Sequence, residues 1–173
     1  SASSAASDVY KRQLNYKGNQ IGKSVKEENC EKIIEQIFET SKQHSCSIIY
    51  PLDVLVGKNL NGVSKAKALD EINSDDLILD IGPKTIDKIK NIIENSETVL
   101  WNGPAGYFEN PNFANGSYEI AKAIIKKNKN KSIYSVVGGG DTIALLNKIN
   151  VIRDFNFVST AGGAFLEYLE GKD

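Results

Sequence analysis

The sequence predicts an α/β protein in which a parallel β-sheet is flanked by helices on both faces, a Rossmann-like three-layer sandwich. Short apolar runs that suit strands alternate with stretches in which apolar residues recur at helical spacing. The predicted strands are apolar throughout and are separated by helices of about 10 to 15 residues, which is typical of a parallel sheet covered on both faces. Glycine-rich segments follow several of these strands.

The composition is that of a globular protein. The chain has 173 residues, of which 40% are hydrophobic and 25% charged, and its formal net charge is −1. This length suits one domain with a real core. The charge balance provides no basic field, so no nucleic-acid partner is expected. The apolar runs are far shorter than the ~20 residues that cross a bilayer, so no membrane association is expected either.

The first residues are expected to be a disordered or non-native leader, residues 1–13. Residues 1–7 read SASSAAS, a low-complexity stretch, and residues 8–13 start no periodic pattern. The stretch also lacks the uninterrupted apolar segment of a signal peptide. Regular structure is therefore expected from Leu14 onward.

The first predicted helix covers residues 27–42, where apolar residues recur at helical spacing. Ser24 is the expected N-cap, because Glu27 stands three residues later as in a capping box. Residues 47–56 (SIIYPLDVLV) are then predicted to form a strand, in which Pro51 indicates a bulge or a break.

The middle of the chain repeats the pattern of strand and helix. Residues 58–76 are polar and are expected to form a loop or a peripheral hairpin. Residues 77–81 (LILDI) are a continuous apolar strand, after which Gly82 and Pro83 turn the chain. Residues 85–94 then place isoleucines on one helical face.

The last part of the chain alternates in the same way. Strands are predicted at residues 98–101, 132–137 and 157–159, and helices at residues 113–127, 142–149 and 163–169.

Three glycine-bearing segments follow predicted strands. They are residues 101–109 (WNGPAGYFE), 135–142 (SVVGGGDT) and 158–172 (VSTAGGAFLEYLEGK), and the last two run directly into predicted helices. Glycine lets a backbone approach an anion closely, and free N–H groups at a helix start bind an anion through hydrogen bonds and the helix dipole. Ligands of parallel sheets bind beyond the carboxyl ends of the strands, where all three segments lie. Together they predict a phosphate site.

The three segments resemble late motifs of the phosphoglycerate kinase family in type, order and spacing. Residues 79–85 (LDIGPKT) resemble a fourth motif, and residues 15–29 (NYKGNQIGKSVKEEN) resemble a further family stretch. The resemblance spans residues 14–172. It implies that residues 14–173 are a partial carboxyl-terminal, nucleotide-binding domain of such a kinase, with a sheet incomplete at its N-terminal end.

The resemblance implies roles for the residues of the second segment. Asp141 would hold Mg²⁺, since one carboxylate together with phosphate oxygens suits this hard cation. The alternative is that Asp141 is an ordinary helix N-cap, which its position alone favours. Gly138, Gly139, Gly140 and Thr142 would bind the nucleotide, with backbone amides and the threonine hydroxyl contacting its phosphates.

Further contacts to the nucleotide are implied around it. Glu109 would accept hydrogen bonds from the ribose hydroxyls, or else is an ordinary surface glutamate. Asn102 would contact the phosphoryl group in transfer or the terminal nucleotide phosphate. Gly82 resembles a position that lines the adenine pocket, although a Gly-Pro after a strand is most often only a turn.

The third segment concerns the phosphoryl group itself. In the family a glycine-rich helix start after the final strand points its amides at this group. Gly162 and Gly163 match it, and with Gly140 they are the predicted catalytic positions. Ala161 replaces the first glycine of the family triplet. Alanine there costs about 1 kcal/mol if the position needs a positive φ, but we expect the position to be already helical, where the replacement is harmless.

The implied reaction is phosphoryl transfer between 1,3-bisphosphoglycerate and ADP, giving 3-phosphoglycerate and MgATP without a covalent enzyme intermediate. The whole kinase is expected to be a cytoplasmic monomer that uses Mg²⁺ with ADP or ATP. Its 3-phosphoglycerate site belongs to an amino-terminal domain that nothing in this sequence resembles. The chain is therefore expected to be a fragment, inactive by itself.

Two other classes of function stay open. The first is a non-catalytic nucleotide-binding α/β module. The second is a structural α/β domain whose glycine turns serve only packing. This second class predicts that Asp141→Ala and Glu109→Ala leave nucleotide affinity unchanged.

Overall fold

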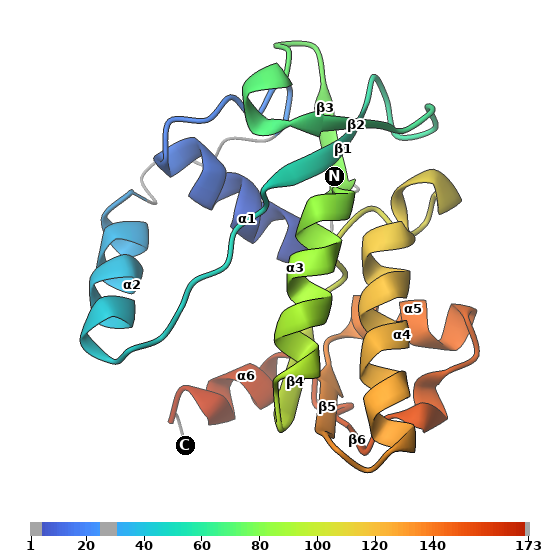
Figure 1. Cartoon of the computed structure of the whole chain (residues 1–173). Coiled ribbons are helices and arrows are strands. Elements are labelled where there is room, and N and C mark those ends of the chain that lie inside the picture. Colours follow the sequence, from blue (N-terminus) through green and yellow to red (C-terminus); the bar gives the residue numbers. More distant parts are fainter. Residues whose placement is uncertain (1–4, 25–30, 172–173) are drawn as a thin grey trace.

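The computed structural model of the chain describes residues 5–24 and 31–171. Its strands form two three-stranded sheets, one antiparallel and one parallel, with helices packed around them (Figure 1). Within the described residues, no helix is long and apolar enough to cross a membrane.

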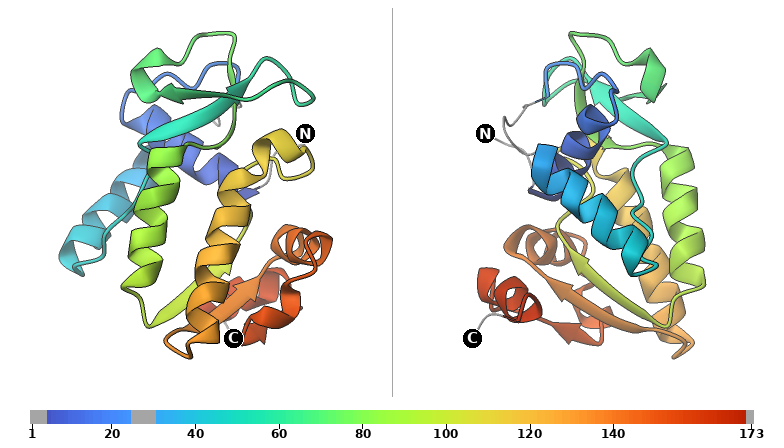
Figure 2. Two further views of the ribbon diagram at one scale, coloured as in Figure 1. Left: turned by 45° about the vertical axis from the view of Figure 1, so that its right-hand side comes forward. Right: turned by 90° about the vertical axis from the view of Figure 1, so that its left-hand side faces the viewer.

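The parallel sheet is built from the last part of the chain. Its strand order is β4 (Thr98–Asn102), β5 (Tyr134–Gly138) and β6 (Phe157–Val158). Two helices, α3 (Pro83–Glu94) and α4 (Asn115–Lys129), lie on one face, and two more, α5 (Gly140–Lys148) and α6 (Gly163–Leu169), lie on the other (Figure 2). The prediction of an α/β fold with a parallel sheet flanked by helices is thus confirmed.

The ends of these elements agree closely with the sequence patterns. Every strand and helix predicted from residue 77 onward corresponds to one observed element, and the ends differ by at most two residues. Three short 3₁₀ turns also occur: η1 (Leu69–Glu71), η2 (Pro111–Phe113) and η3 (Ile152–Asp154).

The other sheet is antiparallel, with the order β2 (Lys65–Ala68), β1 (Asp53–Gly57) and β3 (Leu77–Ile81). The expectation that residues 47–56 and 77–81 belong to one parallel sheet with the later strands is therefore wrong. Residues 58–76, expected to form a loop or a peripheral hairpin, contain β2, which forms a hairpin with β1, a strand that lies before this range.

The cause of the antiparallel pairing lies at Asp53. Its carboxylate accepts hydrogen bonds from the backbone amides of Lys84 (3.0 Å) and Thr85 (2.9 Å), and its carbonyl accepts one from the amide of Gly82 (2.9 Å). These contacts fix the beginning of β1 at the end of β3, so the two strands must run in opposite directions. Upstream of Asp53 the chain is irregular through Pro51, and the predicted strand exists only from Asp53 onward.

The described amino-terminal part of the chain begins with a helix. Helix α1 (Ala5–Tyr16) buries Tyr10 and Leu14 in the core, and the exposed fraction of Leu14 is 0%. The expectation of disorder is therefore wrong for residues 5–13, because apolar side chains one helical turn apart find a packed surface. The predictions that the leader is non-native and that the kinase domain begins at residue 14 stay predictions.

Helix α2 (Glu31–Gln43) confirms the first predicted helix, but its start differs. Glu27, the expected capping partner, lies outside the described residues, and the hydroxyl of Ser24 instead accepts a hydrogen bond from the amide of Ile78 (3.1 Å). The apolar stripe of α2 is only partly covered: Ile33 is 59% exposed and Ile37 49% exposed.

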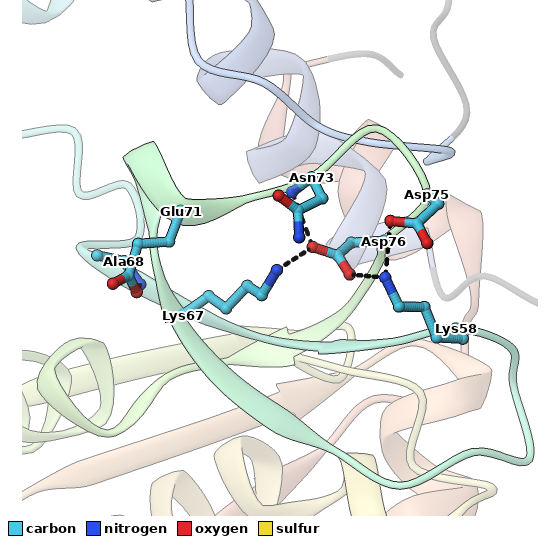
Figure 3. A network of polar contacts seen from close by, with 7 residues as sticks. All are labelled: Lys58, Lys67, Ala68, Glu71, Asn73, Asp75 and Asp76. Atoms are coloured by element: carbon cyan, nitrogen blue, oxygen red, sulfur yellow. Dashed lines mark hydrogen bonds and ion pairs between the residues drawn. The ribbon is translucent and has the colours of Figure 1, made fainter.

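A single carboxylate, that of Asp76, ties the three antiparallel strands together (Figure 3). It accepts hydrogen bonds from Lys67 Nζ (2.6 Å), from Lys58 Nζ (2.8 Å) and from the amide of Asn73 (2.8 Å). Burial alone would raise the pKa of Asp76, but the two ammonium groups hold the pKa well below its usual range. Lys58 also pairs with Asp75 at the surface (2.7 Å).

Another buried carboxylate connects the antiparallel sheet to α4. Asp80, in β3, is fully buried and accepts hydrogen bonds from the amides of Ile81 (2.8 Å) and Gly116 (2.8 Å), the latter in the first turn of α4. Gly106 and Gly116 both lie so close that a Cβ atom would overlap the carboxylate. Burial raises the pKa of Asp80 to about 7, although the two amide donors favour the charged form.

We predict that Lys67→Met destabilises the chain by about 2 to 3 kcal/mol, because it leaves the buried Asp76 without one of its cationic partners. Lys58→Met is the matched control. It makes the same chemical change, but Lys58 is 59% exposed where Lys67 is 8% exposed, so its effect should be much smaller. Urea unfolding measures the free energy of unfolding of both variants. Equal losses of stability in the two would contradict a central role for the buried pair of Lys67 and Asp76.

We predict that Asp80 makes stability decrease with rising pH. Its pKa is about 7 in the folded chain, above that of an unfolded aspartate, so the folded state binds the proton more tightly. The free energy of unfolding therefore falls by up to about 1.4 kcal/mol per pH unit between about pH 4 and pH 7.

Asp80→Asn removes this titration, whatever its effect on absolute stability. Unfolding of both proteins should be followed in urea at intervals from about pH 5 to pH 8. The stability of the wild type relative to the variant should drop as the pH rises through this range. A constant difference between the two would show that Asp80 does not titrate there.

Candidate functional site

The carboxyl ends of the parallel strands bring the three glycine segments to one edge. In the pairing of β4 with β5, Asn102 lies opposite Gly138, so both strands end at the same level. The amide of Ser159 donates to the carbonyl of Val137 (2.8 Å) and carries the end of β6 to the same place. We refer to this region as the carboxyl edge.

Each segment turns at a glycine with a positive φ. These residues are Gly103 (φ 95°), Gly139 (φ 85°) and Gly162 (φ 58°). Gly139 and Gly162 are the N-caps of α5 and α6, and neither helix has a side-chain cap. The amides of both helix starts are thus left for a ligand. Ala161 lies before α6, so the expectation that it is helical is wrong, but it does not have a positive φ and alanine causes no backbone strain there.

The glycines of the second segment differ in what surrounds them. At Gly138 a Cβ atom would come within 2.9 Å of the ring of Phe165, from α6. At Gly139 it would come within 2.9 Å of Asn102 Oδ1. At Gly140 nothing lies within 4 Å, so the space next to the start of α5 is open. The packing of Phe165 was not predicted, because nothing in its local sequence distinguishes it from a core residue.

Asp141 is exposed in the first turn of α5. Since Gly139 is the N-cap of this helix, the alternative that Asp141 caps it is wrong. Among the described residues, no cluster of three or more histidine, cysteine or acidic side chains could hold a metal ion. The donor set fits a hard divalent cation that takes one oxygen from Asp141 and most of its other ligands from a phosphorylated ligand and water.

Thr142 has a structural contact that the sequence did not reveal. Its side chain is fully buried, and its Oγ1 accepts a hydrogen bond from the amide of Gly103 (2.7 Å). The carbonyl of Gly103 accepts another from Trp101 Nε1 (2.8 Å). Trp101 itself is buried. Thr142 thereby fastens the first glycine segment to the start of α5.

Glu109 is exposed at the other end of that segment. Lys148 Nζ, in the last turn of α5, donates to the carbonyls of Phe108 (3.1 Å) and Glu109 (3.3 Å). Sequence analysis did not single out Lys148, because a lysine in the last turn of a helix is common for electrostatic reasons alone.

Gly82 lies elsewhere, between β3 of the antiparallel sheet and α3, of which it is the N-cap. It is buried, and a Cβ atom there would overlap the Asp53 carboxylate. Packing therefore accounts for glycine at this position. This observation supports the alternative of a simple turn, and a contact of Gly82 with a nucleotide stays a prediction.

A parallel α/β sheet with glycine turns and two uncapped helix starts at its carboxyl edge defines the class of α/β proteins that bind phosphorylated ligands there. Comparison with known families narrows this class. The family model for phosphoglycerate kinase matches residues 9–172. The chain belongs to the phosphoglycerate kinase family, a family of transferases, and the resemblance of the sequence motifs is confirmed.

Individual relatives agree. The phosphoglycerate kinase of Chelativorans sp. (strain BNC1) is 39% identical over 159 residues, which are 91% of this chain and 40% of that protein. The enzyme of Rhodopseudomonas palustris is 42% identical over 161 residues. The phosphoglycerate kinase structure from Coxiella burnetii has a TM-score of 0.88 and 37% identity, covering 95% of this chain and 42% of that one. The chain spans about two fifths of the length of these relatives.

We predict that Thr142→Val lowers stability by about 1 to 2 kcal/mol, because the amide of Gly103 loses its acceptor. Thr142→Ser keeps the hydroxyl and should lose less. Thermal or urea unfolding without ligand measures the stability of both variants. A valine variant as stable as the serine variant would show that this hydrogen bond does not stabilise the fold.

Proposed function

We propose that this chain forms the nucleotide-binding part of a phosphoglycerate kinase, and that MgADP or MgATP binds at the carboxyl edge. The observation that carries the proposal is the exposed carboxylate of Asp141 beside the uncapped start of α5, in a member of this family. The complete kinase would transfer a phosphoryl group between 1,3-bisphosphoglycerate and ADP. We further propose that it acts as a cytoplasmic monomer in glycolysis.

The start of α5 would hold the phosphates of the nucleotide. The amides of Gly139 and Gly140 and the positive end of the helix dipole attract anionic oxygens, and the space next to Gly140 is open. Asp141 would hold Mg²⁺, which when bound neutralises phosphate charge. Thr142 would act mainly by holding the first glycine segment in place, since its hydroxyl accepts from Gly103.

The phosphoryl group in transfer would lie between the starts of α5 and α6. Gly162 and Gly163 would direct amides at it, and no atom lies within 4 Å of where a Cβ on Gly162 would be. The side-chain amide of Asn102 lies beside Gly138 and Gly139 and would contact the same group. Fixed donors around the charge that develops stabilise the transition state without a covalent intermediate.

The reaction itself would proceed by direct displacement. An oxygen of the ADP β-phosphate attacks the phosphorus of the acyl phosphate, the bond from phosphorus to the carboxyl oxygen breaks, and 3-phosphoglycerate leaves as a carboxylate. Because this chain spans about two fifths of its relatives, we assign the binding of 3-phosphoglycerate to the remainder of the kinase. A non-catalytic nucleotide-binding module would use the same carboxyl edge, and turnover after the remainder is added distinguishes the two.

We predict that the chain binds MgADP and that Asp141→Asn weakens this binding about tenfold, while it changes the affinity for metal-free ADP little, because Asp141 acts through the cation. Asp154→Asn is the matched control: it also removes one exposed carboxylate, but it lies in η3, before β6, at the opposite end of the sheet.

Backbone amide shifts in two-dimensional NMR spectra measure the binding. The largest shifts are expected at Glu109 and over residues 138–142. A well-dispersed spectrum that does not respond to MgADP would contradict nucleotide binding by this chain. Equal effects of Asp141→Asn on ADP with and without Mg²⁺ would contradict the role of Asp141 as a metal ligand.

A further inference from the structure

The first glycine segment is fastened to α5 at both of its ends. At one end the amide of Gly103 donates to Thr142, in the first turn of the helix (2.7 Å). At the other end Lys148, in the last turn, donates to the carbonyls of Phe108 (3.1 Å) and Glu109 (3.3 Å). The segment therefore runs alongside α5, and the two cannot shift independently without breaking these bonds.

We propose that Lys148 is a positioning residue for Glu109, which it holds in place to receive the ribose hydroxyls of a bound nucleotide. The inference rests on the proposed function, in which Glu109 binds the ribose and the start of α5 binds the phosphates. Lys148 sets the relative position of these two groups, because it belongs to the same helix as the phosphate-binding amides.

The geometry suits this task. The ammonium group of Lys148 bonds to two consecutive carbonyls, and this fixes the orientation of the peptide unit that carries Glu109. The adjoining residue, Phe108, is buried, and Lys148 Nζ lies 5.8 Å from the centre of its ring. Phe108, which supplies one of the carbonyls, is thus held in the core, and Lys148, which supplies the ammonium group, is held in α5.

The contact also leaves the side-chain carboxylate of Glu109 available to a ligand. Among the contacts of the described residues, Lys148 bonds to the carbonyl of Glu109, and no ion pair joins the two side chains. A carboxylate already paired with a cation would have to give up that partner before it accepted hydrogen bonds from a ribose. The backbone contact positions Glu109 and leaves its side chain available.

The role predicts a specific dependence on the ribose hydroxyls. If Lys148 acts through Glu109, its loss weakens the binding of ADP but not of 2′,3′-dideoxy-ADP, which has no hydroxyl for Glu109. If Lys148 acts only through its charge on the phosphates, its loss weakens both nucleotides equally, since both carry the same phosphates.

The test compares Lys148→Met and Lys148→Arg with the wild-type chain, using the magnesium complexes of both nucleotides in calorimetric titrations. Lys148→Met should weaken MgADP about tenfold and leave Mg-2′,3′-dideoxy-ADP within about twofold. Lys148→Arg keeps charged donors and should restore most of the affinity. Lys129→Met is the control, because it removes a lysine from the last turn of another helix, α4, and should change neither affinity.

Equal losses for the two nucleotides, or no loss, would overturn the role of Lys148 while leaving the proposed function intact. Failure of the wild-type chain to bind either nucleotide would contradict the proposed function itself. Hydrogen exchange without ligand tests the positioning separately. In Lys148→Met the amides of residues 107–110 should exchange faster while those of residues 134–138 in β5 stay unchanged, and unaltered exchange at 107–110 would overturn the proposal.

Discussion

The buried carboxylate of Asp80 is the interaction on which the rest of the structure depends. It comes from the antiparallel sheet and holds the first turn of α4 through the amide of Gly116. The loop around Gly106 packs directly against it, and the amide of the next residue, Tyr107, donates to the carbonyl of Leu79 (2.7 Å). Because this loop belongs to the first glycine segment, the carboxyl edge of one sheet rests on a buried carboxyl group supplied by the other. Glycine is required at both positions for the plain reason that no side chain fits beside the carboxylate.

Side-chain oxygens accept hydrogen bonds from many of the donors that the helices and strands leave without a backbone partner. Asp53 satisfies the amides at the start of α3, Asp76 joins the three antiparallel strands, and Thr142 holds Gly103. The starts of α5 and α6 have glycine N-caps and no side-chain cap. Two such helix starts side by side concentrate backbone donors at one edge of the sheet, which is the physical basis of an anion-binding edge.

The sequence predicted the parts of the fold that depend on local pattern. Alternating apolar strands and helices gave every strand and α-helix from residue 77 onward, and glycine placement gave the carboxyl edge. Most of the failures involve contacts between distant residues. The direction of β1 follows from bonds between Asp53 and residues more than 30 positions away. Lys148 lies 39 residues from Glu109, and neither partner is unusual in its own neighbourhood. Helix α1 was missed because its two buried positions, Tyr10 and Leu14, follow a low-complexity run and are too few to form a periodic pattern.

The parallel sheet and its edge are built from consecutive chain. Strands β4, β5 and β6 follow one another in both sequence and space, and α4 and α5 are the connections between them. The glycine turns of the edge are joined by contacts that span much of this stretch, since the amide of Gly103 bonds to Thr142, 39 residues away, and Gly138 lies against Phe165. Residues 98–169 thus have the character of one cooperative folding unit. A ligand bound at the edge as proposed would contact all three of its turns, so its binding energy would resist local opening across that unit rather than at a single loop.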